Sequence, residues 1–281
     1  MNNPVLISTA AFDGYDLGTA IAEIAAAGAD GVEVAFIEGY TDPFTEETFS
    51  QAYADELRQQ LAEHDISCHS FSAHMDLTKP NAVEIFKRRM AFACMLGADT
   101  IITNAAPMAK KDEFMTNIRA LGRIARSLGI MIGLENPGDG KANVIDTAEK
   151  AGPVITELAL DRVVLNYDFG NLISHCFEKV KPEEDYRLAL SQTGHYHIKD
   201  VAPYEYGWVF TAIGDGMIDY GTILSAIAQD KRTLSVSLEI PLRLKRASDA
   251  RPIRSEAPVA LETIREVLQR SMKFVRQAMA V

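Results

Sequence analysis

One kind of junction recurs along this chain: a helical stretch ends at a glycine, and a short apolar run follows. It occurs at Gly28, at Gly97 and at Gly129. Glycine suits the position after a helix because it adopts positive φ without a steric penalty. The runs that follow are continuous rather than alternating, which is typical of strands buried on both faces of a parallel sheet. The chain therefore favours an alternation of helices and buried parallel strands.

This pattern predicts eight strands, and helices separate them. The strands lie near residues 5–8, 31–35, 67–72, 100–103, 130–135, 163–168, 195–199 and 234–239. The helices lie near residues 17–27, 46–63, 82–96, 110–127, 145–158, 183–191, 220–228 and 259–278. Eight such units predict an α/β fold, a single (β/α)₈ TIM barrel over residues 1–281. An open doubly wound sheet is the rival, but the Gly-x-Gly-x-x-Gly fingerprint that often follows its first strand is missing.

The charge and cysteine content of the chain limit the classes of partner and the compartment that we expect. The net charge of −11 disfavours nucleic acid and anionic membrane surfaces. The three cysteines, Cys68, Cys94 and Cys176, form neither a disulfide framework nor a CxxC zinc motif, which indicates a reducing compartment. No signal-peptide pattern and no apolar run of membrane-spanning length is evident. We therefore expect a cytoplasmic protein.

Four consecutive predicted strands end in a side chain that can bind a metal ion. These side chains are Glu135, Asp168, His197 and Glu239. TIM barrels build their active sites at the carboxyl ends of the strands. A single acid at a strand end is usually solvated or ion-paired, and a single histidine is usually a hydrogen-bonded core residue. Four such side chains at equivalent positions predict that they bind one cation together, because buried carboxylates are unfavourable unless a positive charge neutralises them.

Three carboxylates and one imidazole form a hard ligand set. It suits one divalent metal ion, Mn²⁺, Mg²⁺ or Co²⁺, with Zn²⁺ as an alternative. His195 lies two residues before His197 on the same strand, so both share a face, and His195 is expected to contact the substrate or to support the ligands.

The strand-end motifs carry a family resemblance. Leu-Glu135-Asn, Tyr-Asp168-Phe-Gly-Asn171, His195-Tyr-His197-Ile-Lys-Asp and Ser-Leu-Glu239 resemble the xylose-isomerase-like barrel superfamily of sugar isomerases and epimerases. Gly-Val-Glu33-Val and Ile-Gly-Asp-Gly-Met-Ile-Asp are similar to further elements of that family. The resemblance covers nearly the whole chain.

The resemblance implies that Glu135, Asp168, His197 and Glu239 bind the metal and that Glu135 and Glu239 also move the proton. It implies a small carbohydrate substrate and a homo-oligomer as an open possibility. Many relatives carry Asp-x-x-His after the sixth strand, whereas this chain has Asn171, which cannot shuttle protons. The ketose 3-epimerase branch also carries an Arg where Lys199-Asp follows here.

Further candidates lie around this set. His74 and Asn171 are candidate substrate contacts, and Glu33 and Lys199 are candidate supports for the ligands, with surface or structural roles as their alternatives. After Glu239 the chain becomes basic, with Arg243, Arg246, Arg251 and Arg254. Arg243 and Arg246 are the leading candidates for binding an anionic group on the substrate, and a loop paired with acidic neighbours is the alternative.

The leading expectation is isomerisation or epimerisation of a sugar, keto-sugar or sugar acid through an enediolate. A dehydratase on a keto-polyol begins with the same proton abstraction and stays open. An abasic-site endonuclease of the same fold needs additional histidines, and strand 100–103 leads into Asn104 without one. A non-catalytic sugar-binding protein would not need the complete ligand set.

Overall fold

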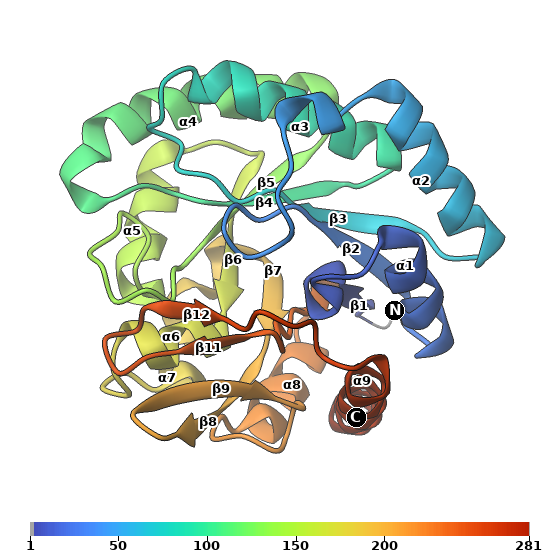
Figure 1. The fold of residues 1–281 in the computed structure, drawn as a ribbon. Coiled ribbons are helices and arrows are strands. Elements are labelled where there is room, and N and C mark those ends of the chain that lie inside the picture. The colour runs from blue at the N-terminus through green and yellow to red at the C-terminus, as the bar shows by residue number, and fades with distance from the viewer. Residues whose placement is uncertain (1–2, 281) are drawn as a thin grey trace.

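The computed structural model of the chain describes residues 3–280. Eight parallel strands close into a barrel, and helices cover its outside (Figure 1). The barrel strands are β1 (Val5–Ser8), β2 (Gly31–Ala35), β3 (Cys68–Ser72), β4 (Thr100–Asn104), β5 (Met131–Glu135), β6 (Val163–Asp168), β7 (Thr193–Ile198) and β10 (Ser235–Leu238). They follow one another in chain order around the barrel, and β10 pairs with β1 to close it. The predicted (β/α)₈ barrel is confirmed.

Each long helix has an apolar face that packs against the strands, and its polar face lies on the outside of the barrel. The helices are α1 (Leu17–Ala26), α2 (Gln51–Glu63), α3 (Ala82–Leu96), α4 (Lys111–Leu128), α5 (Ala148–Leu158), α6 (Phe169–His175), α7 (Pro182–Asp185), α8 (Tyr220–Ala228) and α9 (Leu261–Met279). Gly97 and Gly129 end α3 and α4 at φ values of 87° and 76°, as the recurring junction predicts.

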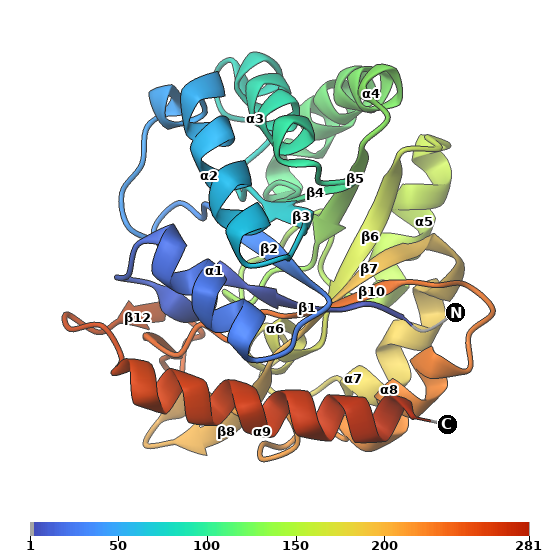
Figure 2. The ribbon, with the colours of Figure 1, turned by 90° about the vertical axis from the view of Figure 1, so that its right-hand side faces the viewer.

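The first strand and the last helix are held together at one residue. Asp30 accepts a hydrogen bond from the Val5 backbone N–H at 2.8 Å, and Arg276 of α9 donates to its other oxygen at 2.7 Å. Helix α9 also meets α1 through Arg265 and Glu23, and the two helices lie side by side on the outside of the barrel (Figure 2). These contacts join the two ends of the chain.

Three predicted helices begin later or divide. The expected helix 46–63 is a 3₁₀ turn followed by α2, because Ser50 caps α2 through the Tyr53 N–H at 3.3 Å. The expected helix 145–158 begins at Ala148, where Thr147 is the cap. The expected helix 183–191 is the short α7 followed by a 3₁₀ segment that is kinked at Ala189.

The sequence did not predict a second sheet. Strands β8 (Asp200–Tyr204), β9 (Gly207–Thr211), β11 (Leu244–Arg246) and β12 (Pro252–Arg254) form an antiparallel sheet in the order β12-β11-β9-β8. Its segments follow β7 and β10, so the sheet extends from the end of the barrel that carries the predicted site (Figure 1). The strands are short and three of the four are largely polar or half-buried, which removes the apolar signal.

Candidate metal centre

The barrel brings the four predicted ligands together. Each of Glu135, Asp168, His197 and Glu239 is buried, and one ligand atom from each lies within 4.8 Å of all the others. Their strands β5, β6, β7 and β10 are neighbours in the barrel. Glu135 and Asp168 end their strands, His197 is the second-last residue of β7, and Glu239 directly follows β10. Closure of the barrel therefore turns four strand ends into one cluster.

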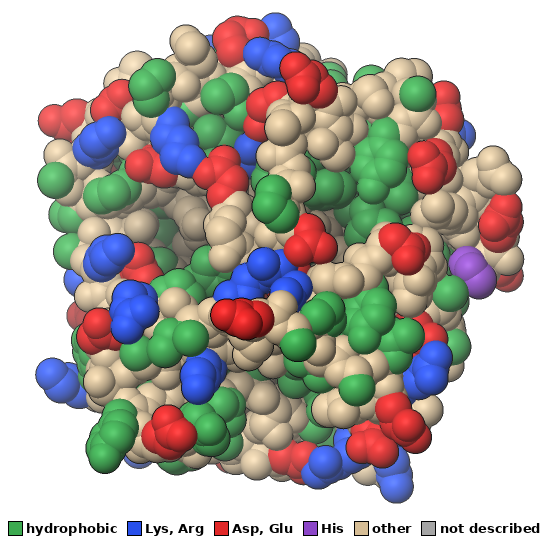
Figure 3. Space-filling view, viewed as in Figure 1, with side chains coloured by type: hydrophobic (Ala, Val, Ile, Leu, Met, Phe, Trp, Pro, Cys, Tyr) green, Lys and Arg blue, Asp and Glu red, His purple; other side chains and the backbone are tan. Residues whose placement is uncertain are grey.

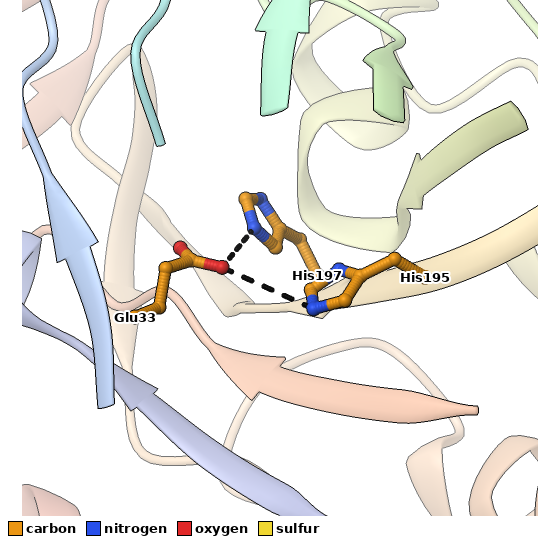
Figure 4. Close-up of side chains that lie close together, drawn as sticks. All are labelled: Glu33, His195 and His197. Carbon is orange, nitrogen blue, oxygen red and sulfur yellow. Dashed lines mark hydrogen bonds and ion pairs between the residues drawn. The ribbon is translucent and has the colours of Figure 1, made fainter. Parts of the chain in front are cut away.

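His197 is the centre of this cluster. Its Nδ1 lies 2.7 Å from Glu135 Oε2 and 3.3 Å from Glu239 Oε2. Its Nε2 points the other way and lies 3.0 Å from Glu33 Oε2 (Figure 4). Glu33 in turn accepts hydrogen bonds from the hydroxyls of Ser70 and Ser72 on the neighbouring strand. A proton on Nε2 shared with Glu33 leaves Nδ1 as the lone-pair atom that faces the cluster.

His195 lies beside this pair rather than in front of it. Its Nδ1 is 2.8 Å from Asn166 Oδ1, and its Nε2 is 4.0 Å from Glu33 (Figure 4). Burial lowers the pKa of His195 to about 4, assisted by the neighbouring His197, so its ring is neutral at pH 7. His195 is not among the residues that line the pocket, which favours the second of its two expected roles, support of the ligands.

Three asparagines hold two of the candidate ligands, Glu135 by its carboxylate and Asp168 by its backbone. Asn166 donates to Glu135 Oε2 at 2.7 Å, and Asn171 donates to Glu135 Oε1 at 2.9 Å. Asn136 binds the backbone of Asp168 on both sides, accepting from its N–H at 2.8 Å and donating to its carbonyl at 2.9 Å. The side-chain amide of Asn171 donates to Glu135 and to the Asn136 carbonyl, and its oxygen accepts no hydrogen bond among the described residues.

Lys199 enters the cluster itself. Its Nζ lies 2.6 Å from Asp168 Oδ2 and forms an ion pair with Glu239 Oε2. Although burial opposes its charge, the carboxylates of Asp168 and Glu239 hold its pKa well above the usual range. Sequence reasoning expected Lys199 as a support for the ligands, and the structure places its ammonium in direct contact with two of them.

Charge is not shared evenly among the acids. Burial, together with repulsion from Glu135 and Glu239, raises the pKa of Asp168 to about 7. Burial also works against ionisation of Glu239, but Lys199 and His197 hold its pKa well below the usual range. For Glu33, burial is likewise outweighed by His197 and His195, which lower its pKa to about 2. Asp168 is therefore the acid of the cluster that ionises least readily.

The donor set fits a divalent cation. Asp168 Oδ2 and His197 Nδ1 are buried and make no hydrogen bond within the described residues, although charged groups lie close to both. Three carboxylates with one ammonium carry a net charge of −2, which a divalent cation balances. Oxygen-rich sets with one imidazole suit Mg²⁺ and Mn²⁺. Glu135, Asp168, His197 and Glu239 would hold the ion.

A pocket of about 260 Å³ opens onto this cluster. His74, Glu135, Asn171, Lys199 and Glu239 line it, together with Arg246. His74 Nε2 lies 3.2 Å from Ser72 Oγ and 3.6 Å from Glu135 Oε2. The volume is below the roughly 300–1,000 Å³ of pockets for drug-sized ligands, so the pocket fits a small substrate. The molecule is hollowed on the face seen in Figure 3, where acidic and basic side chains alternate around the hollow.

The arginines of the basic segment, residues 243–254, have different partners. Arg243 pairs with Asp13 at 3.5 Å and donates to the carbonyls of Ser255 and Glu256, and Arg254 binds Asp13 and Asp42 at 2.7 Å. These two arginines hold the loop to the barrel and do not line the pocket. Arg246 alone of the four arginines lines it.

Sequence reasoning missed several pocket residues. Tyr40, Asp76, Lys79 and Asp139 line the pocket from loops that follow β2, β3 and β5. Loops have no hydrophobic period, so only their position after a strand end could have indicated them.

The fold and the cluster define a TIM barrel with an acid-rich cluster, able to hold a metal ion, at the carboxyl ends of its strands. The sequence pattern of the xylose isomerase-like TIM barrel family matches residues 21–270. The chain belongs to this family, as the resemblance implied. No curated protein sequence matches it significantly.

Solved structures share the fold at low sequence identity. D-psicose 3-epimerase with D-tagatose from Clostridium cellulolyticum H10 has a TM-score of 0.77 at 17% identity, over 99% of this chain and 100% of that one. A xylose isomerase-like barrel protein from Mycobacterium smegmatis in complex with magnesium has a TM-score of 0.73 at 17% identity, over 99% and 98%. A probable 3-DHS dehydratase, AsbF, from Bacillus anthracis has a TM-score of 0.70 at 13% identity, over 97% and 98%. None of the helices that the structure describes combines the length and apolarity needed to cross a membrane.

Proposed function

We propose that the protein is a metal-dependent isomerase or epimerase of a small sugar, keto-sugar or sugar acid. The observation that carries the proposal is the convergence of Glu135, Asp168, His197 and Glu239 within 4.8 Å, with Glu135 and Glu239 also lining a small pocket. A divalent ion there would polarise a substrate carbonyl and stabilise the enediolate oxygens that form when the adjacent C–H proton leaves.

Glu135 and Glu239 are the proton-transfer groups in this proposal. They lie on β5 and directly after β10, with β6 and β7 between these strands, so their carboxylates reach the cluster from different sides. Both line the pocket, and the pKa of each lies below its usual value, so each is ionised at neutral pH. One carboxylate takes the proton next to the carbonyl, and the other returns a proton to the opposite face of the same carbon.

In this proposal Asp168 and His197 hold the metal ion in place and do not transfer the proton. Neither lines the pocket, and both are fixed by hydrogen bonds, Asp168 to the Asn171 N–H at 2.9 Å and His197 to Glu33. Lys199 does line the pocket, so its ammonium can donate to a developing substrate oxyanion while it remains close to Glu239.

A dehydratase is the second candidate, and Lys199 favours it. An ammonium at the pocket wall is able to donate a hydrogen bond to a departing hydroxyl and stabilise its developing charge, a step that epimerisation does not include. The fold similarity to the probable dehydratase is of the same order as that to the epimerase. Product analysis separates the two, because elimination creates an unsaturated chromophore.

The test is solvent proton exchange. The protein reconstituted with Mg²⁺ or Mn²⁺ is incubated in deuterated water with ketoses, keto-sugars and sugar acids, and deuterium incorporation is followed by NMR. We expect metal-dependent exchange at the carbon next to a carbonyl in at least one class. Absence of exchange across all three classes, with metal binding verified, would contradict the proposal.

A further inference from the structure

Arg246 is a buried cation that has no acidic partner among residues 3–280. Its side chain is only 5% exposed, and it lines the pocket at the end of β11. Within residues 3–280 its guanidinium makes one hydrogen bond, from Nη1 to the Ala250 carbonyl at 3.2 Å, and no ion pair. A guanidinium has five N–H donors, and a buried charge without a counter-ion is unfavourable. The arginine therefore fits an anion that arrives with a ligand.

Its neighbours in the same segment are different. Arg243 and Arg254 share Asp13, and Arg251 is exposed beside Asp249. Lys79, another basic residue of the pocket, is paired with Glu38. Lys199 is occupied by Asp168 and Glu239. Of the basic side chains that line the pocket, Arg246 is the one with no acidic partner among the described residues.

Arg246 lies next to the residues that hold Glu135. A methyl group placed on Gly138 would meet Asn171 Oδ1 at 2.5 Å and Arg246 Nη2 at 2.8 Å, so both side chains border the same small space. Asn171 in turn donates to Glu135. A small ligand can therefore touch Arg246 with one end while its other end lies at the carboxylates. Glycine at position 138 leaves this space open.

The guanidinium is held in place. Arg246 pairs along its backbone with Trp208 of β9 and Pro252 of β12. Its guanidinium carbon lies 5.5 Å from the centre of the Tyr40 ring. Ala250, whose carbonyl receives the Nη1 hydrogen bond, has φ of 64°, a conformation that non-glycine residues adopt rarely. A fixed arginine loses little entropy when it binds a ligand.

We propose that the substrate is a sugar acid whose carboxylate pairs with Arg246. This inference rests on the proposed function and names its substrate class. The planar guanidinium matches a planar carboxylate in a two-bond pair. A phosphate carries close to two negative charges, and Glu38, Asp76 and Asp139 also line the pocket. A single carboxylate meets less repulsion there.

The test measures binding by calorimetry on the protein reconstituted with Mg²⁺. The probes are five- to seven-carbon aldonates and uronates, the corresponding neutral sugars, and sugar 6-phosphates. The variants are wild type, Arg246→Met, Arg246→Lys and the matched control Arg251→Met, all checked for the wild-type Tm. We expect at least one carboxylate to bind wild type tenfold or more tightly than its neutral counterpart. Arg246→Met removes this preference, Arg246→Lys retains part of it, and Arg251→Met leaves it unchanged.

Three results would overturn the inference. A carboxylate preference that survives in Arg246→Met shows that a group other than Arg246 binds the carboxylate. Tighter binding of the 6-phosphates assigns the site to phosphate. Equal binding of neutral sugars and acids, or no binding by any acid, removes the anionic substrate altogether.

Proton exchange separates this inference from the proposed function. Exchange on neutral sugars, with KM unchanged in Arg246→Met, supports the isomerase and contradicts the sugar-acid substrate. Arg246-dependent binding of a sugar acid without exchange supports the anion site and contradicts the isomerase. Where both hold, Arg246→Met raises KM for the acid tenfold or more, and wild-type exchange on that acid depends on the metal.

Discussion

His197 Nε2 lies 3.0 Å from Glu33 Oε2, on the side of the ring opposite Glu135 and Glu239. A proton on Nε2, donated to Glu33, would leave Nδ1 free to bind a cation. Glu33 itself is fully buried and held by two serines, so the ring has one stable orientation.

Glu33→Gln should weaken metal binding by about 10- to 100-fold, because partners of ligating histidines typically have effects of this size. Equilibrium dialysis with Mn²⁺ measures the affinity directly. Glu157→Gln, an exposed change on α5, is the control and should bind like wild type. Wild-type affinity in Glu33→Gln would remove Glu33 from the support of the site.

Removal of the metal should lower Tm. A ligand that binds only the folded state stabilises it by RT ln(1 + [L]/Kd), about 2.7 kcal/mol at 100 times Kd. Differential scanning calorimetry with and without chelator measures the shift. In Asp168→Asn the chelator should lower Tm much less. A shift in Tm equal to that of wild type would place the metal at another site.

Lys199→Met should separate stability from metal affinity. The change leaves Asp168 and Glu239 buried without their cation, and breaking a buried pair costs about 3–5 kcal/mol. The metal-free protein should therefore unfold at lower denaturant concentration, while the more negative cluster binds Mn²⁺ more tightly. The exposed Lys231→Met serves as control. Weaker Mn²⁺ binding in Lys199→Met would contradict this account of the charge balance.

Glu135→Gln and Glu239→Gln should each lower kcat by about 10²- to 10⁴-fold, the range of a lost general acid or base. Deuterium exchange then assigns the roles, because loss of the base abolishes exchange. Metal content has to be measured in each variant, since both residues are also candidate ligands. Near-normal turnover in a variant that keeps its metal would show that the replaced glutamate is not a proton-transfer group.

Asp30 provides a pH test away from the metal centre. Burial would raise its pKa, but hydrogen bonds from Arg276 and the Val5 N–H bring it below the usual value. A depressed pKa in the folded state means that the carboxylate stabilises the fold above its unfolded pKa near 4 and loses that contribution as pH falls below it. Asp30→Asn should cost about 0.5–1.5 kcal/mol at pH 7 and much less at pH 3, with solvent screening keeping the effect small. Urea unfolding at both pH values measures it, and an equal loss at both would contradict the assignment.

The sequence predicted the barrel because its signals are local. Glycine at helix ends and unbroken apolar runs located all eight strands, and the bounds of β1, β2 and β6 are as predicted. The four candidate ligands were visible because each lies at or near the end of a recognisable strand. Their convergence, which barrel closure produces, follows from the fold class alone.

What could not be predicted depends on contacts far apart in the chain. Lys199 was recognised as a neighbour of the ligands, but its contact with Glu239 joins residues 40 positions apart. The four arginines of the basic segment are indistinguishable in sequence, and the second sheet separates them by pairing β11 with β9 and β12. Helix α6 was missed because Asp168 is both a strand end and a helix cap, accepting from the Asn171 N–H.

The second sheet lies outside the closed ring of strands that carries the candidate ligands. The four candidate ligands belong to barrel strands whose register is fixed around a closed ring, so they tolerate little change. Arg246 belongs to short strands outside that ring. Exchange of residues 200–211 and 244–254 would alter which molecule the pocket accepts without disturbing the groups that would act on it. Substrate choice in such a barrel can therefore diverge faster than its chemistry.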